Sequence, residues 1–575
     1  MASGETATLN PARYALGPTA PTVAAEVQEW RTTDRITRFW HGEAGVWSGA
    51  DENKWVGWQG IVEAELAHVE TLERFAAEIR AAGFRYAVTV GMGGSSLCPD
   101  VLRRTFGRQL GAPELLVMDS VVPAQIRTVL KQIDLRSTVF LVASKSGSTI
   151  EPNTLKQLFW DEVTKAVGPE KASDHFVAIT DPGTKMEQIA RSERFRAILY
   201  GRPDIGGRYS ALSKFGMVPA AAMGLNVRRF LASAHLMTQA CRQHEANPGV
   251  ELGCALGVLA KQGRDKVTII ASPGIGLLGA WVEQLVAEST GKQGVGIVPV
   301  DDEIPGPPSL YGKDRLFVYA RLATAPSAMQ DAAVAALEAA GQPVVVIDVH
   351  SEYDLGQEFF RWEVATAVAG AILKINPFDQ PDVEAAKIAA RKLTSEYETT
   401  GKLAAPTALV SETGMAAFAG AEYAGRLTGA GGGRGLDLVL KRHLDSIESG
   451  DYFAINAYVD MNDANIATLQ ALRHVVRASK KCATTLGFGP RFLHSTGQLH
   501  KGGANNGVFL QITADDAHDL AIPGQRFSFG VLKTAQAQGD FEVLVERKRR
   551  VLRVHLGADV TQGLQVLGQR IAALL

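Results

Sequence analysis

The stretch TVFLVASKSGSTIEPNT, residues 138–154, joins an apolar strand to a helix through a loop of hydroxyl side chains. Its first six residues are apolar or β-branched, which is typical of a strand buried on both faces in a parallel sheet. Ser144, Lys145, Ser146 and Thr149 follow where this strand ends, just before a helical pattern begins. Because free N–H groups at a helix start attract anions, the stretch predicts a phosphate-binding turn. An ordinary polar turn with a serine N-cap is the alternative.

Strand and helix patterns alternate along the chain on both sides of this stretch. Strand patterns occupy residues 84–90, 114–120, 138–143 and 175–181, and again 265–271, 315–321 and 343–349. Strands separated by helices of this length indicate βαβ units and a parallel sheet. The sequence therefore predicts an α/β fold with two parallel-sheet α/β/α sandwiches, each opening with a strand, a glycine-rich turn and a helix.

The length of 575 residues is more than one compact core covers, so we expect several units. They are an N-terminal helical segment (1–84), a first sandwich (85–235), a second sandwich (236–403) and a C-terminal α/β unit (404–575). For the last unit we expect a linker at 404–414, a flexible loop at 428–435, and strands at 452–460, 507–513, 541–548 and 549–556.

The composition is that of a globular protein, with 46% hydrophobic and 21% charged residues. The 59 basic and 61 acidic residues leave a net charge of −2, which gives no bulk electrostatic attraction to nucleic acid or to a membrane surface. No apolar run approaches the roughly 20 residues of a membrane span. The four cysteines are scattered, without metal-ligand spacing or a disulfide framework, so we expect a cytoplasmic protein.

A second turn of the same kind, GMGGSS at residues 91–96, follows the strand at 84–90 and contains Gly94 and Ser95. In an open parallel sheet, turns that follow strands meet at the carboxyl edge, where ligands bind. The chain has neither a GxxxxGK[ST] loop nor a GxGxxG turn at either place. A nucleotide or dinucleotide site is therefore disfavoured.

A helical pattern at residues 281–292 carries a candidate acid. Gln284 and Glu288 are four residues apart, so they share one helix face. This helix follows the glycine turn of the second sandwich, which would place the carboxylate over a cleft between the two sandwiches. The alternative is a solvated Glu288 that pairs with Lys292, four residues further on.

Two further stretches carry candidate cations. Arg208 follows a glycine pair that ends with Gly207, where the backbone can approach a ligand closely. A surface turn bearing an arginine is the alternative. In residues 375–387, prolines and aspartates precede a helical pattern that reaches Lys387. Such a pattern alone is typical of a capped helix.

Together these blocks resemble the glucose-6-phosphate isomerase family, which has two sugar-isomerase (SIS) domains. In chain order they are GMGGSSL (91–97), ASKSGSTIEPNT (143–154), GGRYSALS (206–213), QLVAESTGK (284–292) and NPFDQPDVEAAK (376–387). They cover about residues 85–390. The C-terminal block TLGFGPRFLHSTGQLHKGGANNGVFLQI (485–512) is similar to the isomerase half of bacterial transaldolase–glucose-6-phosphate isomerase fusions, and we expect an isomerase portion that stands alone.

The resemblance implies an aldose–ketose isomerase that interconverts glucose 6-phosphate and fructose 6-phosphate through an enediolate, without metal or cofactor, in glycolysis and gluconeogenesis. Glu288 matches the family's base, which moves the proton between C2 and C1. Arg208 matches the arginine that stabilises the enediolate, and Lys387 a lysine that assists ring opening. The implied substrate- and phosphate-binding residues are Gly94, Ser95, Ser144, Lys145, Ser146, Thr149, Gly207, Gln284 and Gln380.

The ring-opening histidine is a departure from the family pattern. Familiar two-domain members have it between the base and the lysine in sequence, supplied by another subunit. Between Glu288 and Lys387 this chain has only His350, in a segment unlike the family's histidine block. We expect His500, in GQLHKGG, to be supplied by the C-terminal unit of the same chain. His494 is a second candidate, and a histidine packed for structure is the alternative.

Two other functions stay open at this point. One is an isomerase for a related 6-phospho or 6-sulfo sugar, because an anion socket would also accept a sulfonate. The other is a sugar-phosphate-binding SIS regulator, which would not need Glu288, Arg208 and Lys387 together. We expect a small-molecule sugar phosphate as the ligand, and neither nucleic acid nor a membrane as a partner. Monomer and homodimer both stay open, as does a functional link to a separate transaldolase.

Overall fold

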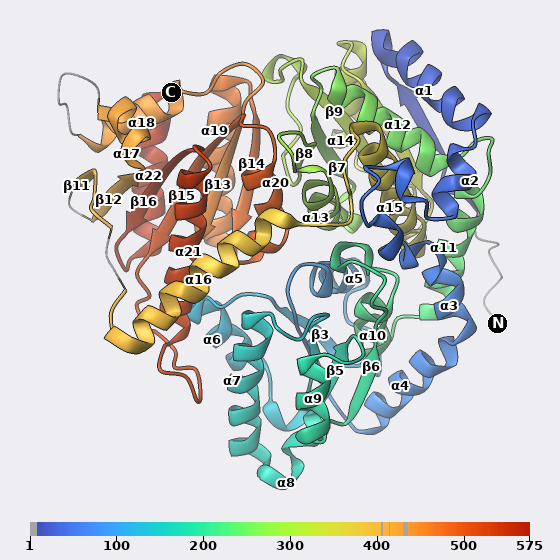
Figure 1. Cartoon of the computed structure of the whole chain (residues 1–575). Coiled ribbons are helices and arrows are strands. Elements are labelled where there is room, and N and C mark those ends of the chain that lie inside the picture. Colours follow the sequence, from blue (N-terminus) through green and yellow to red (C-terminus); the bar gives the residue numbers. More distant parts are fainter. Residues whose placement is uncertain (1–7, 404–405, 413, 429–434) are drawn as a thin grey trace.

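The computed structural model describes residues 8–403, 406–412, 414–428 and 435–575, and these form three β-sheets surrounded by helices (Figure 1). The predicted α/β fold with two parallel-sheet sandwiches and a further α/β unit is confirmed. Most of the loop expected at 428–435 lies outside the described residues. The division into units at residues 84, 235 and 403 stays a prediction.

The first sheet is parallel throughout, with strand order β3-β2-β4-β5-β6. Its strands are β2 (Tyr86–Val90), β3 (Glu114–Met118), β4 (Thr138–Ala143), β5 (Phe176–Thr180) and β6 (Ala197–Tyr200). The helices of this region are α5 (Leu97–Phe106), α6 (Pro123–Gln132), α7 (Ile150–Val167), α8 (Pro169–Ala172), α9 (Lys185–Ser192), α10 (Lys214–Ala222) and α11 (Val227–Cys241). All six residues of β4 are buried, as the apolar run predicts.

The second sheet has the order β1-β10-β9-β7-β8, with β1 antiparallel at one edge. Its strands are β1 (Ala12–Ala15), β7 (Lys266–Ala271), β8 (Val298–Val300), β9 (Arg315–Leu322) and β10 (Val344–Val349). The helices are α12 (Pro248–Lys261), α13 (Leu278–Thr290), α14 (Ala328–Ala339), α15 (Leu355–Leu373) and α16 (Pro381–Thr400). Because β1 completes this sheet, the N-terminal segment is more than a helical extension.

The N-terminal segment otherwise consists of the helices α1 (Ala20–Thr32), α2 (Arg35–Trp40), α3 (Ile61–Ala67) and α4 (Val69–Ala81). Their apolar side chains belong to the same hydrophobic core as residues of both sandwiches. Trp58, which precedes α3, lies 5.1 Å from the ring of Tyr209, centroid to centroid. The segment is therefore packed against the region where the two sandwiches meet.

The C-terminal sheet has the order β11-β12-β16-β15-β13-β14, and its last four strands are parallel. Its strands are β11 (Val410–Glu412), β12 (Met415–Ala419), β13 (Tyr452–Tyr458), β14 (Ala483–Phe488), β15 (Gly507–Ala514) and β16 (Arg550–Leu556). The helices are α17 (Ala421–Thr428), α18 (Leu436–Asp445), α19 (Asp463–Lys480), α20 (Gly497–Gly502), α21 (Phe529–Glu546) and α22 (Val560–Leu574).

Two expectations for the C-terminal unit are wrong. The strand predicted at 541–548 is the end of α21, a helix so extensively buried that its apolar run carries no clear period. The linker predicted at 404–414 contains β11, which forms an antiparallel pair with β12. The other three predicted strands of this unit correspond to β13, β15 and β16.

The C-terminal unit is held against both sandwiches. Helix α16 leaves the second sandwich and runs along α21, where a Cβ at Gly539 would lie only 2.9 Å from Ala390 N (Figure 1). Ile522, Phe527 and Leu532 of the C-terminal unit are part of the core of the first sandwich. Burying a large apolar side chain contributes roughly 1.5–3 kcal/mol to the free energy of folding. The apolar contact between the C-terminal unit and the first sandwich is therefore substantial.

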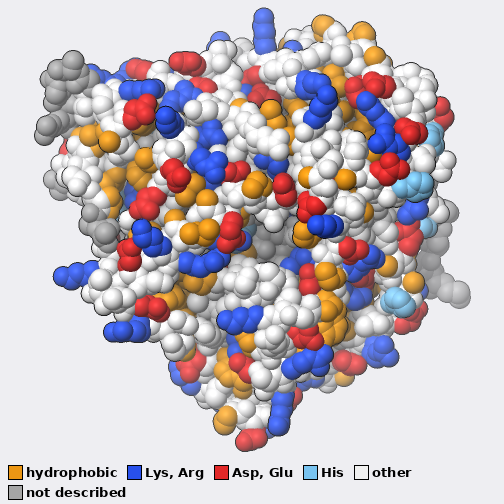
Figure 2. Space-filling view, in the orientation of Figure 1, with side chains coloured by type: hydrophobic (Ala, Val, Ile, Leu, Met, Phe, Trp, Pro, Cys, Tyr) orange, Lys and Arg blue, Asp and Glu red, His pale blue; other side chains and the backbone are white. Residues whose placement is uncertain are grey.

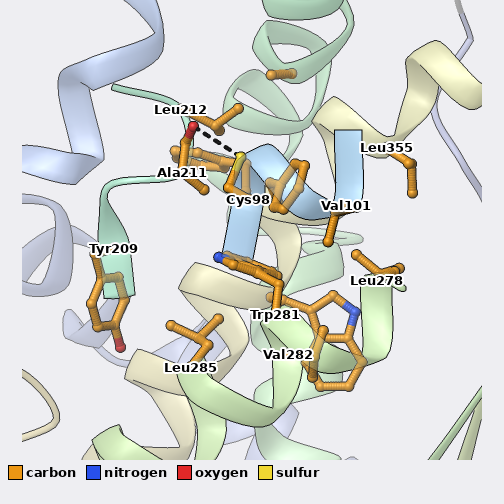
Figure 3. Packing of buried hydrophobic residues seen from close by; sticks show 14 of the residues in the cluster. Cys98, Val101, Tyr209, Ala211, Leu212, Leu278, Trp281, Val282, Leu285 and Leu355 are labelled. Atoms are coloured by element: carbon orange, nitrogen blue, oxygen red, sulfur yellow. Dashed lines mark hydrogen bonds between the residues drawn. The ribbon is translucent and has the colours of Figure 1, made fainter. Parts of the chain in front are cut away.

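The two sandwiches meet through α5 and α13, whose apolar faces pack on each other (Figure 3). Figure 3 shows Val101 of α5 close to Leu278 of α13, and the Cys98 thiol donates to Ala211 O at 3.5 Å. This contact places the glycine turn that precedes α5 next to the helix that carries Glu288.

The surface carries charges of both signs. On the face shown in Figure 2, lysine and arginine side chains alternate with aspartate and glutamate, and the face is hollowed near its centre. Among the described residues, no helix combines the length and apolar character needed to cross a bilayer.

Candidate active site

Two polar turns lie side by side at the carboxyl edge of the first sheet. β2 leads into the turn at 91–96, which contains the 3₁₀ helix η5 (Gly93–Ser95), and β4 leads into the turn at 144–149. Because β2 and β4 are neighbouring parallel strands, both turns and the starts of α5 and α7 share one edge. The structure thus brings the predicted hydroxyl groups to one region.

Two of these hydroxyls, those of Ser144 and Thr149, do not serve to stabilise the turn. Ser144 is buried, and its Oγ has no hydrogen-bond partner among the described residues. Thr149 is the N-cap of α7, yet its side chain does not bond to the helix. A buried hydroxyl without a partner costs free energy, so an unpaired Ser144 is more consistent with a ligand site than with a polar turn alone. Ser146 is exposed, with its Oγ 2.9 Å from Ser148 Oγ.

Lys145 is bound within the protein. Its Nζ donates to Asp181 Oδ1 and to Arg202 O, both at 2.8 Å, and lies 5.0 Å from the centre of the Phe215 ring. Burial lowers the pKa of Lys145, and the neighbouring Asp181 carboxylate opposes that change. The ammonium therefore contributes positive charge near the turn from a fixed position.

Arg208 lies at the centre of a buried hydrogen-bond network. It is in the 3₁₀ helix η8 (Gly207–Tyr209), and its Nε donates to Ser289 Oγ at 2.8 Å. Its Nη1 donates to Gln380 Oε1 at 2.9 Å, and its Nη2 to Pro377 O and Asp379 O at 2.7 and 2.8 Å. This side chain is 1% exposed, so the expected alternative of a surface arginine is wrong.

Glu288 and Gln284 share one face of α13, as their spacing predicts. Gln284 Nε2 donates to Glu288 Oε2 at 3.0 Å, and Arg208 Nη1 lies 3.4 Å from Glu288 Oε1. Gln284 Oε1 is buried without a hydrogen-bond partner among the described residues. The alternative of a solvated pair with Lys292 is wrong, because Glu288 is buried and Lys292 donates to Asn376 and Asp379 instead.

Glycines allow these elements to meet. A Cβ at Gly94 would lie 1.8 Å from Gly207 O, so the turn before α5 is in direct backbone contact with the one that carries Arg208. A Cβ at Gly93, which has φ +56°, would lie 2.7 Å from Gln284 Nε2 and 2.9 Å from His494 O. No other residue type would fit at these two approaches.

A cavity of about 120 Å³ adjoins this group. Lys387, His494 and Thr149 line it, together with side chains of α16, α20 and α21. Glu288 and Arg208 are not among its lining residues; Gly93, packed between Gln284 and His494, connects the two regions. Lys387 has a 39% exposed side chain, and Gln380 joins the group through Arg208.

His494 is the histidine that the structure brings to this site. It ends the 3₁₀ helix η12 (Arg491–His494) beyond β14, and its Nε2 lies 3.0 Å from Glu151 Oε1. Gln536 Nε2 also donates to Glu151 Oε1, at 2.6 Å. Burial alone would raise the pKa of Glu151, but the facing His494 and these hydrogen bonds outweigh it and lower the pKa.

His500 and His350 lie elsewhere. His500 is 2% exposed and packs among the rings of Tyr452, Phe492 and Phe509, where burial lowers its pKa well below the usual value. It does not line the cavity, which fits the alternative of a structurally packed histidine. His350 follows β10, and its backbone N–H donates to Asn10 Oδ1 at 3.2 Å.

The GQLHKGG block (497–503) links elements of different units through the side chain of Gln498. Gln498 donates to Gly291 O at 2.9 Å and to Asp382 Oδ2 at 2.7 Å, and it accepts from Asp382 N at 2.9 Å. It thereby ties α20 to the end of the helix that carries Glu288 and to the start of α16. This block joins the C-terminal unit to α13 and α16.

Sequence reasoning missed Glu151 and Gln536. Glu151 lies within the quoted stretch, but a glutamate in the first turn of a helix is common because it complements the helix dipole. Gln536 lies on α21, 385 positions away from Glu151. No local signal points to it. Among the described residues no cluster of three or more histidine, cysteine, aspartate or glutamate side chains has metal-binding geometry.

Comparison with known proteins gives a consistent result. A family model described as phosphoglucose isomerase matches residues 73–301. The glucose-6-phosphate isomerase of Rubrobacter xylanophilus is 30% identical over 369 residues, which cover 56% of this chain and 85% of the relative. That of Carboxydothermus hydrogenoformans is 28% identical over 385 residues, covering 57% and 82%. With that of Acaryochloris marina, 32% identical over 277 residues, the match covers 44% of this chain and only 52% of the relative.

Solved structures agree at the level of the fold. A hypothetical protein from Thermus thermophilus aligns with a TM-score of 0.59 and 23% identity, covering 67% of this chain and 99% of that one. A glucose-6-phosphate isomerase from Chlamydia trachomatis aligns with a TM-score of 0.55 and 20% identity, covering 67% and 88%. The aligned part is thus about two thirds of the present chain.

Proposed function

The chain belongs to the glucose-6-phosphate isomerase family, and on that premise we propose that it interconverts glucose 6-phosphate and fructose 6-phosphate through an enediolate. The observation that carries this proposal is the buried contact of Arg208 with Glu288, 3.4 Å apart, beside the hydroxyl-lined turns of the first sheet. An aldose–ketose isomerisation needs a base that moves a proton between two carbons of the sugar, and a fixed cation that stabilises the enediolate.

The phosphate end of the substrate would bind at the two turns. Ser144 offers an unpartnered hydroxyl, and Ser95, Ser146 and Thr149 lie on the same sheet edge. The free N–H groups at the starts of α5 and α7 add partial positive charge. Lys145, held by Asp181, contributes through its field.

Glu288 would remove the proton from C2 and return it to C1. Gln284, bonded to one carboxylate oxygen, fixes the rotamer of Glu288, and its free Oε1 can accept from a sugar hydroxyl. The Arg208 guanidinium donates to Ser289, to Gln380 and to the carbonyls of Pro377 and Asp379. Its charge therefore cannot move away as the enediolate forms. A preorganised charge of this kind lowers the barrier without reorganisation.

His494 would open the sugar ring together with Lys387, because both line the same cavity. Glu151 holds the imidazole in place through its hydrogen bond with Nε2. This assignment replaces His500. Each step is given to a side chain of this chain, so the proposed mechanism requires neither metal nor cofactor. The proposed reaction belongs to glycolysis and gluconeogenesis.

The geometry also supports a site that is complete within one chain. His494 comes from the C-terminal unit, Glu151 from the first sandwich and Glu288 from the second. A separate transaldolase partner stays a prediction from the likeness of the C-terminal block.

The proposal is tested by comparing kcat/KM for fructose 6-phosphate, mannose 6-phosphate and a 6-sulfonated fructose in coupled or chromatographic assays. We expect fructose 6-phosphate to be turned over most efficiently. A higher kcat/KM for either other sugar would move the assignment to that substrate, and no turnover of any of them would refute it.

A further inference from the structure

Lys292 is a buried lysine at the end of the catalytic helix. Its side chain is 1% exposed, and its Nζ donates to Asn376 O at 2.7 Å, Asp379 Oδ1 at 2.7 Å and Asp379 O at 2.5 Å. An ammonium has three hydrogens and no lone pair, so each of its donors has one acceptor. All three acceptors belong to one short turn, residues 376–380.

The same turn supplies three of the four hydrogen-bond acceptors of Arg208; the fourth is Ser289 Oγ on α13. Pro377 O and Asp379 O accept from Arg208 Nη2, and Gln380 Oε1 accepts from Nη1. Asp379 O therefore accepts from both cations. Arg208 and Lys292 hold the 376–380 turn from two elements, η8 and the end of α13, and α16 with Lys387 begins directly after it.

We propose that Lys292 is a positioning residue of the isomerase: its charged ammonium fixes the 376–380 turn, and through that turn the orientation of Arg208 and Gln380 beside Glu288. This inference rests on the proposed function. Lys292 has no contact with the cavity, so it acts through its neighbours.

The charge state of Lys292 matters to this role. A neutral amine has two hydrogens and a lone pair, so one of the three oxygens would face that lone pair and the turn would loosen. The groups that face Lys292 are Arg208 on η8, Glu288 on α13 and Asp379 in the turn. Burial, and then the Arg208 charge, lower its pKa to about 8 against the opposing effect of the two carboxylates. The ammonium is therefore present below about pH 8 and lost above it.

The test compares Lys292→Met and Lys292→Arg with the wild type, with Lys374→Met as the matched control because Lys374 is exposed in the same connection. We expect Lys292→Met to lower kcat for fructose 6-phosphate roughly 10- to 100-fold with a smaller change in KM, as for a misoriented catalytic group. The wild type should lose kcat above about pH 8. Lys292→Met should lack this alkaline limb, and Lys292→Arg should regain activity and move the limb to higher pH.

A second measurement does not depend on activity. Hydrogen exchange of the backbone amides at 378–384 in the wild type should accelerate beyond the intrinsic pH effect as the pH rises past 8, while those of α4 should not. Unchanged kcat and pH profile in Lys292→Met, or exchange at 378–384 that follows only the intrinsic rate, would overturn the inference. A wild type that exchanges as expected but does not isomerise fructose 6-phosphate would instead refute the proposed function.

Discussion

His494 Nε2 lies 3.0 Å from Glu151 Oε1, although 343 positions separate the two residues in the chain. The pair joins the loop after β14 of the C-terminal sheet to the first turn of α7 in the first sandwich. It lies beside Lys387 in one cavity, whereas His500 is enclosed by aromatic rings. The proposed assignment of ring opening to His494 rests on this pair.

Replacing the two histidines separately distinguishes their roles. We expect His494→Ala to lower kcat on glucose 6-phosphate roughly 10²- to 10⁴-fold, the usual loss of a general acid–base group. His500→Ala removes a buried ring and should lower the free energy of unfolding by roughly 2–5 kcal/mol, while the folded enzyme keeps most of its kcat. Steady-state assays and urea unfolding of both variants measure these effects. The reverse pattern, with His500→Ala inactive and folded, would restore the sequence-based assignment.

Mixing two inactive variants tests whether the site is complete within one chain. Glu288→Gln and His494→Ala each lack one essential group, so neither chain contains a whole site. If Glu151, Glu288 and His494 of one chain act together, a mixture of the variants after joint refolding should have no more activity than either alone. The specific activity of the wild type should likewise be independent of concentration. Recovery of about a quarter of the wild-type activity in the mixture would indicate sites shared between chains.

Glu363 predicts how stability depends on pH. It is fully buried on α15, and both carboxylate oxygens lack hydrogen-bond partners among the described residues. Burial raises its pKa well above the usual value, so the folded state keeps it protonated while the unfolded chain ionises near pH 4.3. Its contribution to stability is therefore full below about pH 4 and falls by about 1.4 kcal/mol per pH unit as the pH rises towards the raised pKa.

Glu363→Gln should remove this pH dependence, because the amide does not ionise. Urea unfolding midpoints of the wild type and the variant between pH 5 and 8 should converge at low pH and separate at high pH, with the variant more stable there. Glu78→Gln, at an exposed position of α4, serves as the control. Parallel curves for the wild type and Glu363→Gln would show that Glu363 does not titrate as proposed.

Gly94 predicts a steric effect at the site. A Cβ there would lie 1.8 Å from Gly207 O, so Gly94→Ala must separate the turn before α5 from Arg208. We expect at least a 10²-fold loss of kcat/KM together with a lower unfolding midpoint, since a displacement of about 1 Å has such an effect on catalysis. Gly425→Ala on α17, where nothing lies within 4 Å, should change neither. Full activity in Gly94→Ala would mean that this backbone contact is not needed.

The sequence predicts much of the fold because the signals are local. The all-apolar run of β4 and the polar turn after it indicate a buried parallel strand and its carboxyl end, and the structure agrees. Pairing between distant segments has no such signal: β1 is four residues long and is recognisable only beside β10. In α21 the local signal is present but misleading, because a helix buried on nearly all sides has the same apolar run as a buried strand.

For the candidate site, too, the sequence predicts the local features and misses those that depend on residues distant in the chain. The spacing of Gln284 and Glu288 predicts a shared helix face, and the structure has it. The choice between His494 and His500 depends on Glu151 and on a ring of aromatic side chains, which come from other parts of the chain. From the sequence, Lys292 is interpretable as a solvated partner of Glu288. The neighbouring residues carry no signal that the 376–380 turn covers Lys292.

The most direct test of the central claim is solvent exchange at the substrate's carbon atoms. Fructose 6-phosphate incubated in D₂O with the wild type should incorporate deuterium at C1, and the glucose 6-phosphate formed should carry it at C2, as followed by proton NMR. If Glu288 moves this proton, Glu288→Gln should slow incorporation by roughly 10³-fold or more, while Glu78→Gln should equal the wild type. Incorporation by Glu288→Gln at the wild-type rate would contradict the account.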